Sequence, residues 1–247
     1  MNMASITQLG SRSSNLMETS ERDSSSSSSS EPMSWITWFC SRAGHEFFVE
    51  IKPEFIEDPF NLTGLSMAVP FYREALELIL DRLPTETLEH IGVEVLETSA
   101  QVLYGLIHQR FILTRTGLHM MAEKYTVGHF GCCPRVYCNY IHTLPCGRSD
   151  IVGLEPVMLF CPNCLDIYTP SSSRYRNVDG AFFGTTFAHL FFQTYPELRP
   201  KRTGPSGKVY EPRIYGFKIS EYSTMGPRMQ WLRLFLSDTE SSERDSS

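Results

Sequence analysis

Apolar residues recur at three- and four-residue steps over much of the first half of the chain, and this spacing predicts helices. The longest such pattern runs from Val93 to Leu113. Shorter patterns cover Phe71–Leu80, which follows Pro70 as helix starts often do, and Gly117–Tyr125. The positions expected to face a core are Phe71, Ala75, Leu78, Ile79, Val95, Leu96, Ala100, Leu103, Leu106, Ile107, Ile112, Leu118, Met121, Ala122 and Tyr125.

Both ends of the chain lack this periodicity. Residues 1–33 contain the unbroken serine run Ser24–Ser30, and such a segment buries too little apolar surface to offset the entropy lost on ordering. We therefore expect a disordered tail there and a second polar tail over 223–247. Order is expected to begin at Ser34, which is placed to cap a short aromatic helix starting at Trp35.

The second half of the chain has a different pattern. Prolines interrupt it, and short runs such as Val157–Phe160 are typical of strands. The aromatic stretch Ala181–Tyr195 predicts a mostly buried helix. Val209–Ile219 predicts an extended or hairpin segment.

Four of the seven cysteines form two closely spaced pairs. Four residues lie between Cys133 and Cys138, two lie between Cys161 and Cys164, and 22 residues separate the pairs. Two knuckles of this kind present four sulfurs to one tetrahedral zinc ion, and four thiolates leave no open position for catalysis. We therefore predict one structural zinc ion per chain. Four buried thiols without metal are the alternative, and Cys132, His142 and Cys146 are competing ligands nearby.

These patterns together predict an α+β fold. A mainly helical N-terminal part is followed by a four-cysteine zinc ribbon and a C-terminal extended or hairpin segment. The expected divisions are a tail over 1–33, a helical domain over 34–128, a zinc-ribbon domain with its following helix over 129–195, a docking segment over 196–222, and a tail over 223–247.

Composition and missing motifs exclude several functional classes. The chain has a net charge of −6, and its basic residues are not concentrated on the predicted ribbon, which disfavours nucleic acid as a partner. No apolar run reaches the roughly 18 residues of a membrane span, and the N-terminus lacks a secretory signal. We expect location in the cytoplasm and nucleus, without membrane association. No nucleophile elbow, phosphate-binding glycine loop, zinc-protease motif or kinase signature occurs, so no enzyme activity is predicted.

Several longer motifs resemble the regulatory beta subunit of the protein kinase casein kinase II. The resemblance extends from about residue 30 to about residue 220 and covers both cysteine pairs. The motifs are Ser34–Cys40, Glu46–Phe48, Phe60–Leu65, Leu103–His108, Phe130–Gly131, Asp179–Thr185, His189, Arg199–Arg202 and Arg213–Ile219.

The resemblance implies a non-catalytic chain that dimerises through the ribbon and joins two catalytic alpha subunits in a tetramer. It implies effects on the stability and substrate choice of the kinase, and pairing with other beta chains. By the same resemblance the dimer interface would include Pro134, Val136, Tyr137 and Ile167 around the zinc ion. Tyr215 and Phe217 would be aromatic anchors for the kinase, on one face of an extended strand because they are two residues apart. Packing of both onto their own domain is the alternative.

The chain also departs from the family pattern. About thirty residues precede Ser34, and apolar residues interrupt the dense acidic loop expected near Asp81–Glu97, which the family associates with polyamines and basic substrates. These differences suggest a divergent paralogue. Two other functions stay open: a beta-like chain that dimerises without supporting the kinase, and a zinc-ribbon protein that binds nucleic acid.

Three serines are candidate phosphorylation sites. Casein kinase II favours an acidic residue three positions after the modified serine. Ser28 precedes Glu31 at this spacing, and Ser20 and Ser237 have the same relation to Asp23 and Glu240. The alternative for the serine run is a plain solvated tail.

Overall fold

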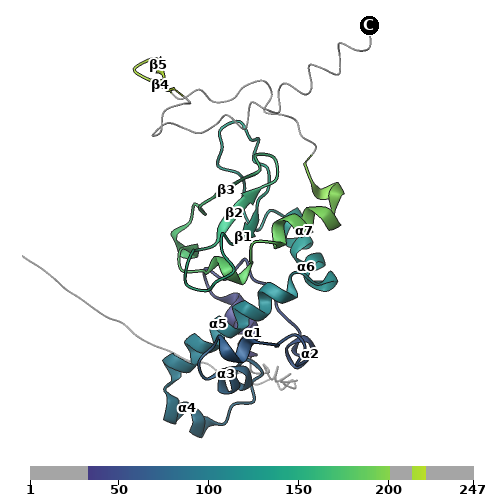
Figure 1. Ribbon diagram of the computed structural model, residues 1–247, viewed down its shortest axis with the longest axis vertical. Coiled ribbons are helices and arrows are strands. Elements are labelled where there is room, and N and C mark those ends of the chain that lie inside the picture. Colours follow the sequence, from purple (N-terminus) through teal and green to yellow (C-terminus); the bar gives the residue numbers. More distant parts are fainter. Residues whose placement is uncertain (1–32, 201–212, 221–247) are drawn as a thin grey trace, which may run out of the picture. The chain divides into compact units, whose positions relative to one another are not determined.

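The computed structural model describes residues 33–200 and 213–220 (Figure 1). Almost all of the predicted 1–33 tail, the 223–247 tail and the candidate phosphorylation sites Ser20, Ser28 and Ser237 lie outside these residues. Within them, no helix is long and apolar enough to span a bilayer.

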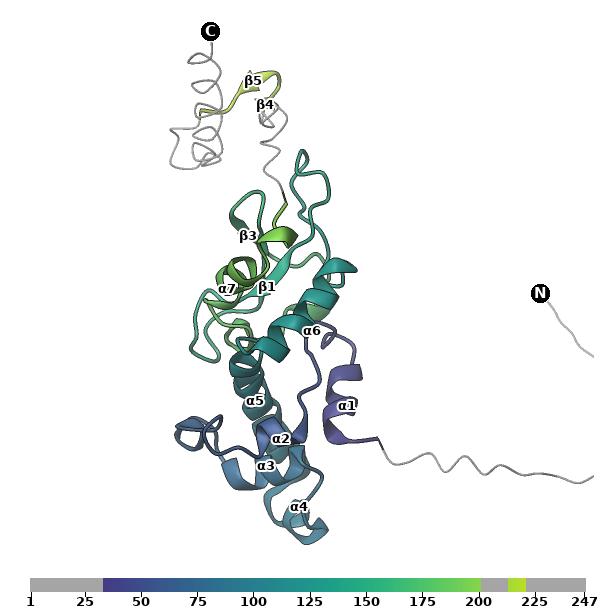
Figure 2. The ribbon, with the colours of Figure 1, turned by 90° about the vertical axis from the view of Figure 1, so that its right-hand side faces the viewer.

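Six α-helices form the first part of the described chain, with the long α5 running through them (Figures 1 and 2). Ser34 caps the first helix as predicted, since its hydroxyl accepts a hydrogen bond from the Thr37 N–H. Two helices, Pro53–Ile56 and Thr85–Ile91, were not predicted, because both are short and carry little apolar periodicity. The helices are α1 (Trp35–Ser41), α2 (Pro53–Ile56), α3 (Tyr72–Ile79), α4 (Thr85–Ile91), α5 (Val93–Phe111) and α6 (Arg115–Thr126), with a 3₁₀ turn at Leu65–Met67.

Most of the predicted core positions are buried, including those on α3, α5 and α6. Two predictions were wrong. Val95 is 49% exposed, because neighbours on a helix point about 100° apart and Leu96 takes the inward direction. Phe71 is 45% exposed because it precedes α3 in a left-handed conformation (φ 50°), so α3 begins one residue later than predicted.

Two buried polar side chains of α5 hold a neighbouring segment that belongs to no helix or strand. The Tyr104 hydroxyl donates to the Val49 C=O (2.9 Å) and accepts from the Ile51 N–H (3.2 Å). His108 accepts from the Val49 N–H at Nε2 (3.2 Å) and donates from Nδ1 to the Phe182 C=O (2.9 Å). These side chains thus supply the hydrogen bonds that a neighbouring strand would otherwise provide.

His108 should make folding stability depend on pH. Its complete burial lowers the pKa of the imidazole to about 4, whereas the unfolded chain has the ordinary value of 6.5. The unfolded state therefore binds more protons between these pH values, so stability is full above pH 6.5 and falls as pH drops toward 4. The shift corresponds to about 3 kcal/mol at most. The free energy of unfolding, measured in urea at several pH values across this range, should fall more steeply with decreasing pH for the native chain than for His108→Gln. Equal slopes for the two chains would contradict the prediction.

The second part of the described core is a small antiparallel sheet with strand order β1-β2-β3. Its strands are β1 (Leu144–Cys146), β2 (Met158–Cys161) and β3 (Asp166–Tyr168). The register pairs Leu144 with Phe160 and Phe160 with Ile167. The strand expected at Val157–Phe160 is thus confirmed, displaced by one residue.

The predicted helix at Ala181–Tyr195 is confirmed only in its second half. A 3₁₀ turn (Gly180–Phe182) comes first, and α7 (Phe187–Thr194) follows. Gly184 lies between them at φ 74°, a conformation that interrupts an α-helix. The expectation of burial was correct for Phe187 and Phe191, which are fully buried.

One contact joins α5 closely to the segment before α7. A Cβ atom at Gly105 would lie only 2.3 Å from Cδ1 of the Phe182 ring. The adjoining C=O of Phe182 accepts the hydrogen bond of His108. Gly105 is therefore needed for the close packing of the helical part on the chain that follows the ribbon.

The described C-terminal residues form a hairpin of β4 (Arg213–Ile214) and β5 (Phe217–Lys218). The expected hairpin is confirmed for these residues, but the placement of Tyr215 on a strand was wrong. Tyr215 and Gly216 form the turn, with φ values of 49° and 86°, as two-residue hairpin turns require. The observed fold is α+β as predicted, and the proposed domain boundaries stay predictions.

Candidate metal centre

The four paired cysteines come from two tight turns beside the sheet. Cys133 and Cys138 lie in the loop after α6, and the Cys138 N–H donates to the Arg135 C=O (3.0 Å). Cys161 ends β2 and Cys164 lies in the turn to β3, where the Leu165 N–H donates to the Cys161 C=O (2.8 Å). Each turn folds the chain back so that its two sulfurs point the same way.

The sulfur atoms of these cysteines lie within 4.8 Å of one another, and all four residues are buried. Individual Sγ–Sγ distances are 3.7 Å for Cys133–Cys164, 3.6 Å for Cys138–Cys161 and 3.4 Å for Cys164–Cys138. A tetrahedron with metal–sulfur bonds of about 2.3 Å has edges of about 3.8 Å. The donor set and its spacing therefore fit one thiophilic metal ion.

The cluster has the electrostatics expected of sulfurs that share a small volume. Hydrogen bonds from Cys161 and Cys164 lower the pKa of Cys133 to about 4. The Cys161 pKa is raised by its hydrogen bonds with Cys133 and Cys164 and by burial. These opposite shifts arise because the sulfurs share protons, and one thiolate disfavours ionisation of the next. A bound divalent cation would stabilise all four cysteines as thiolates at once.

Hydrogen-bond donors around the cluster also stabilise the thiolate form of the cysteines. The Asn163 amide donates to Cys138 Sγ (3.3 Å), and the Cys164 N–H donates to Cys161 Sγ (3.4 Å). Arg135 contacts the Tyr168 hydroxyl (2.8 Å). Sequence reasoning missed Asn163 and Arg135, because neither type of residue is diagnostic without its position.

The three competing ligands are not part of the cluster. Cys132 is exposed, and Cys146 is buried in the hydrophobic core on β1. His142 directs Nδ1 to the Tyr125 C=O (3.0 Å). In the described residues, the four cysteines are the only group of three or more His, Cys, Asp or Glu side chains close enough to hold one ion.

The other candidate site residues lie mainly on the surface. Beside the cluster, Val136 is 69% and Tyr137 is 41% exposed, Pro134 is also exposed, and Ile167 is half-buried. Tyr140, which was not predicted, is 83% exposed in the same loop.

In the hairpin, Tyr215 is 97% and Phe217 is 80% exposed. Neither side chain is buried in the described part of the chain, and their role as anchors for the kinase stays a prediction. Large aromatic side chains in this state are available to a partner.

Comparison with known proteins places these observations in a family. The profile of the family described as casein kinase II regulatory subunit matches residues 34–218. Casein kinase II subunit beta-2 of Schizosaccharomyces pombe is 68% identical over 225 residues, which cover 91% of this chain and 89% of that protein. Casein kinase II subunit beta of the same organism is 51% identical over 200 residues, covering 81% and 85%. Subunit beta-1 of Neurospora crassa is 45% identical over 269 residues, covering 84% and 81%.

Two consequences follow from these similarities. The higher identity to beta-2 than to beta in one organism is consistent with the expected paralogue. The match over most of the chain confirms the resemblance based on the motifs. The chain belongs to the casein kinase II regulatory subunit family, whose members are regulatory and not catalytic.

Proposed function

We propose that this chain binds one structural zinc ion, forms a homodimer through the ribbon, and binds the catalytic alpha subunit of casein kinase II through its C-terminal hairpin. In this role it would change the stability and the substrate choice of the kinase. The observation that carries the proposal is the buried cluster of four cysteine sulfurs within a chain that matches the regulatory family over residues 34–218.

Zinc is the metal that best fits the donor set. Four thiolates with tetrahedral spacing favour zinc over hard cations such as magnesium and calcium, which take oxygen ligands. Burial of all four residues leaves the ion no position for substrate. The ion would therefore be structural, and its binding would contribute to the folding of the ribbon.

Dimerisation is supported by the apolar surface next to the cluster. Val136, Tyr137 and Pro134 are exposed on a rigid turn, and a second copy would remove them from water. Ile167 is half-buried on β3 and would lie at the margin of this surface.

Charged residues at this surface should separate the two copies. We expect Val136→Glu combined with Tyr137→Glu to give a monomer in sedimentation experiments, because two carboxylates per copy would face an apolar partner. Zinc content should not change, since neither side chain is a ligand. Val93→Glu, at an exposed position on α5, is the matched control and should stay dimeric. A double variant that sediments as a dimer would rule out this interface.

The test of the regulatory function is reconstitution with the alpha subunit. We expect a complex of two regulatory and two catalytic chains by native mass measurement, together with altered rates on a panel of peptide substrates. The second candidate, a beta-like chain that dimerises without supporting the kinase, predicts a regulatory dimer alone. The exposure of Tyr215 and Phe217 favours the first candidate. Binding to DNA at physiological salt would instead support a nucleic-acid function.

Two further proposals concern residues outside the described structure and the location in the cell. Ser28, Ser20 and Ser237 are proposed substrates of the kinase, and mass spectrometry after incubation with the complex tests them. The cytoplasm and nucleus are the proposed compartments, because their reducing conditions keep the cysteines available to the metal. Fluorescence imaging of a tagged chain tests this location.

A further inference from the structure

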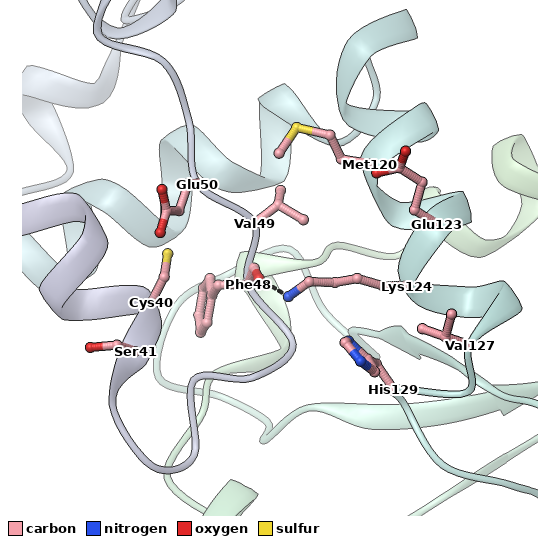
Figure 3. Close-up of a pocket in the computed structure, with 10 residues that line it drawn as sticks. All are labelled: Cys40, Ser41, Phe48, Val49, Glu50, Met120, Glu123, Lys124, Val127 and His129. Atoms are coloured by element: carbon pink, nitrogen blue, oxygen red, sulfur yellow. Dashed lines mark hydrogen bonds between the residues drawn. The ribbon is translucent and has the colours of Figure 1, made fainter.

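A pocket of about 550 Å³ lies between α1, α6 and the segment that Tyr104 and His108 hold in place (Figure 3). None of its lining residues belongs to the metal cluster, the proposed dimer surface or the hairpin. The pocket therefore has no role in the functions proposed so far. It is lined by Cys40, Ser41, Phe48, Val49, Glu50, Met120, Glu123, Lys124, Val127 and His129.

One wall of the pocket offers an unpaired piece of backbone. Along an extended segment, successive residues direct their N–H and C=O groups to opposite sides. Val49 and Ile51 direct theirs toward α5, whereas the C=O of Phe48 faces α6 and accepts a hydrogen bond from Lys124. Glu50 alternates with Val49 and Ile51, so its N–H and C=O are directed to the pocket side. Within residues 33–200 and 213–220, neither group has a protein partner.

The charges lining the pocket favour a cation. Glu50 and Glu123 contribute carboxylates from opposite walls (Figure 3). The single ammonium group, on Lys124, is turned into the protein, where it donates to the C=O groups of Glu46 (2.8 Å) and Phe48. Burial lowers the pKa of Lys124, which reflects its loss of contact with water. The accessible charge at the mouth is therefore mainly negative.

Besides the free backbone groups and the carboxylates, the pocket offers apolar side chains. Phe48 and Met120 line the pocket from facing walls, and Val127 is 67% exposed at the end of α6. A free donor and acceptor pair beside apolar side chains is the arrangement that binds a peptide as an added strand.

We propose that this pocket docks an extended segment of a protein partner in which a basic side chain stands next to an apolar one. The peptide backbone pairs with the N–H and C=O of Glu50. Its basic side chain lies between the carboxylates of Glu50 and Glu123, and its apolar side chain contacts Met120 and Val127. The biological role of this docking rests on the proposed regulatory function, since the docked segment would select substrates for the kinase. Peptide binding itself needs only residues of this chain and can be measured without the kinase.

The probe is a fluorescein-labelled Val-Arg-Val-Arg-Val peptide, titrated with the full-length, metal-loaded chain and followed by fluorescence anisotropy. We expect it to bind at least about tenfold more tightly than Val-Glu-Val-Glu-Val, because the carboxylates repel the second peptide. Glu50→Gln combined with Glu123→Gln should weaken binding of the basic peptide by about tenfold. Glu54→Gln combined with Glu94→Gln changes carboxylates outside the pocket and is the matched control.

Two outcomes of the titration would overturn the proposal. One is equal binding of the basic and acidic peptides. The other is an equal loss of affinity in the pocket and control variants, which would show a general attraction to the acidic chain. Val127→Ser removes the apolar contact at an exposed position without adding charge, should fold normally, and should also weaken binding. Thermal melting and zinc content of each variant establish that it is folded.

Hydrogen exchange tests how the peptide binds. The amide of Glu50 should become protected when the basic peptide is added, and its protection should be absent beforehand. Protection without peptide would show that another segment of this chain or a second copy occupies the pocket, and would contradict the proposal. Reconstitution with the alpha subunit is measured separately. Peptide binding without kinase binding would refute the proposed function alone, and the reverse result would refute the docking pocket alone.

Discussion

Cys161→Ser should abolish metal binding and unfold the ribbon. The Cys161 sulfur lies 3.6 Å from that of Cys138 and is fully buried, so serine would leave a three-sulfur site with an uncoordinated hydroxyl. Structural zinc sites contribute on the order of 10 kcal/mol to folding, which exceeds the stability of many whole domains. Elemental analysis should find less than one zinc ion per chain, and circular dichroism should show a lower melting temperature.

The exposed cysteine beside the cluster provides a matched control for this substitution. Cys132→Ser changes an exposed thiol outside the cluster and should retain the metal and the melting temperature of the native chain. A strong chelator added to the native chain should reproduce the effect of Cys161→Ser, because it removes the same ion. The assignment would be wrong if Cys161→Ser kept stoichiometric zinc, or if the metal-free native chain melted like the metal-loaded one.

Tyr215→Ala combined with Phe217→Ala should weaken binding of the alpha subunit by about 100- to 1000-fold. The two rings are 97% and 80% exposed, so their burial against the kinase would remove almost all of their surface from water. Aromatic anchors of this kind often contribute about 2 kcal/mol or more each, and 1.4 kcal/mol corresponds to a factor of ten. Calorimetric titration of the alpha subunit with each variant measures the change.

Several controls separate docking from folding. The double variant should stay dimeric and retain zinc, because the hairpin contains no ligand of the metal. Tyr215→Phe keeps the ring and should bind nearly as well as the native chain, whereas Val93→Ala removes an exposed apolar side chain elsewhere. An affinity that does not change in the double variant would refute the proposed role of the hairpin.

The sequence was most informative where one residue type recurs at a regular spacing, as the cysteines and the apolar positions of the helices do. Two cysteine pairs at short spacing predict a shared site, because few other structures need four sulfurs arranged in this way. Helical periodicity located α5 and α6 for a similar reason, since many positions contribute to one pattern. The helix α4 was missed because Thr85–Ile91 carries too little apolar periodicity to distinguish a surface helix from a loop.

Other features depend on contacts between distant residues and could not be predicted. Tyr104 and His108 are polar in type, yet both are fully buried because they bond to the backbone of Val49 and Ile51. Tyr215 was placed on a strand by its two-residue spacing from Phe217, but a left-handed turn overrides that alternation. The free N–H and C=O of Glu50 at the pocket likewise result from tertiary contacts of the neighbouring residues rather than from any local motif.

The contact between Gly105 and Phe182 limits how this family of chains can vary. Any side chain at position 105 would occupy space that the ring of residue 182 already fills. The two positions are 77 residues apart in the chain, yet each restricts the size of the other. Substitutions there should accordingly be tolerated only as compensating pairs, with a gain of volume on the helix matched by a smaller residue in the opposing turn.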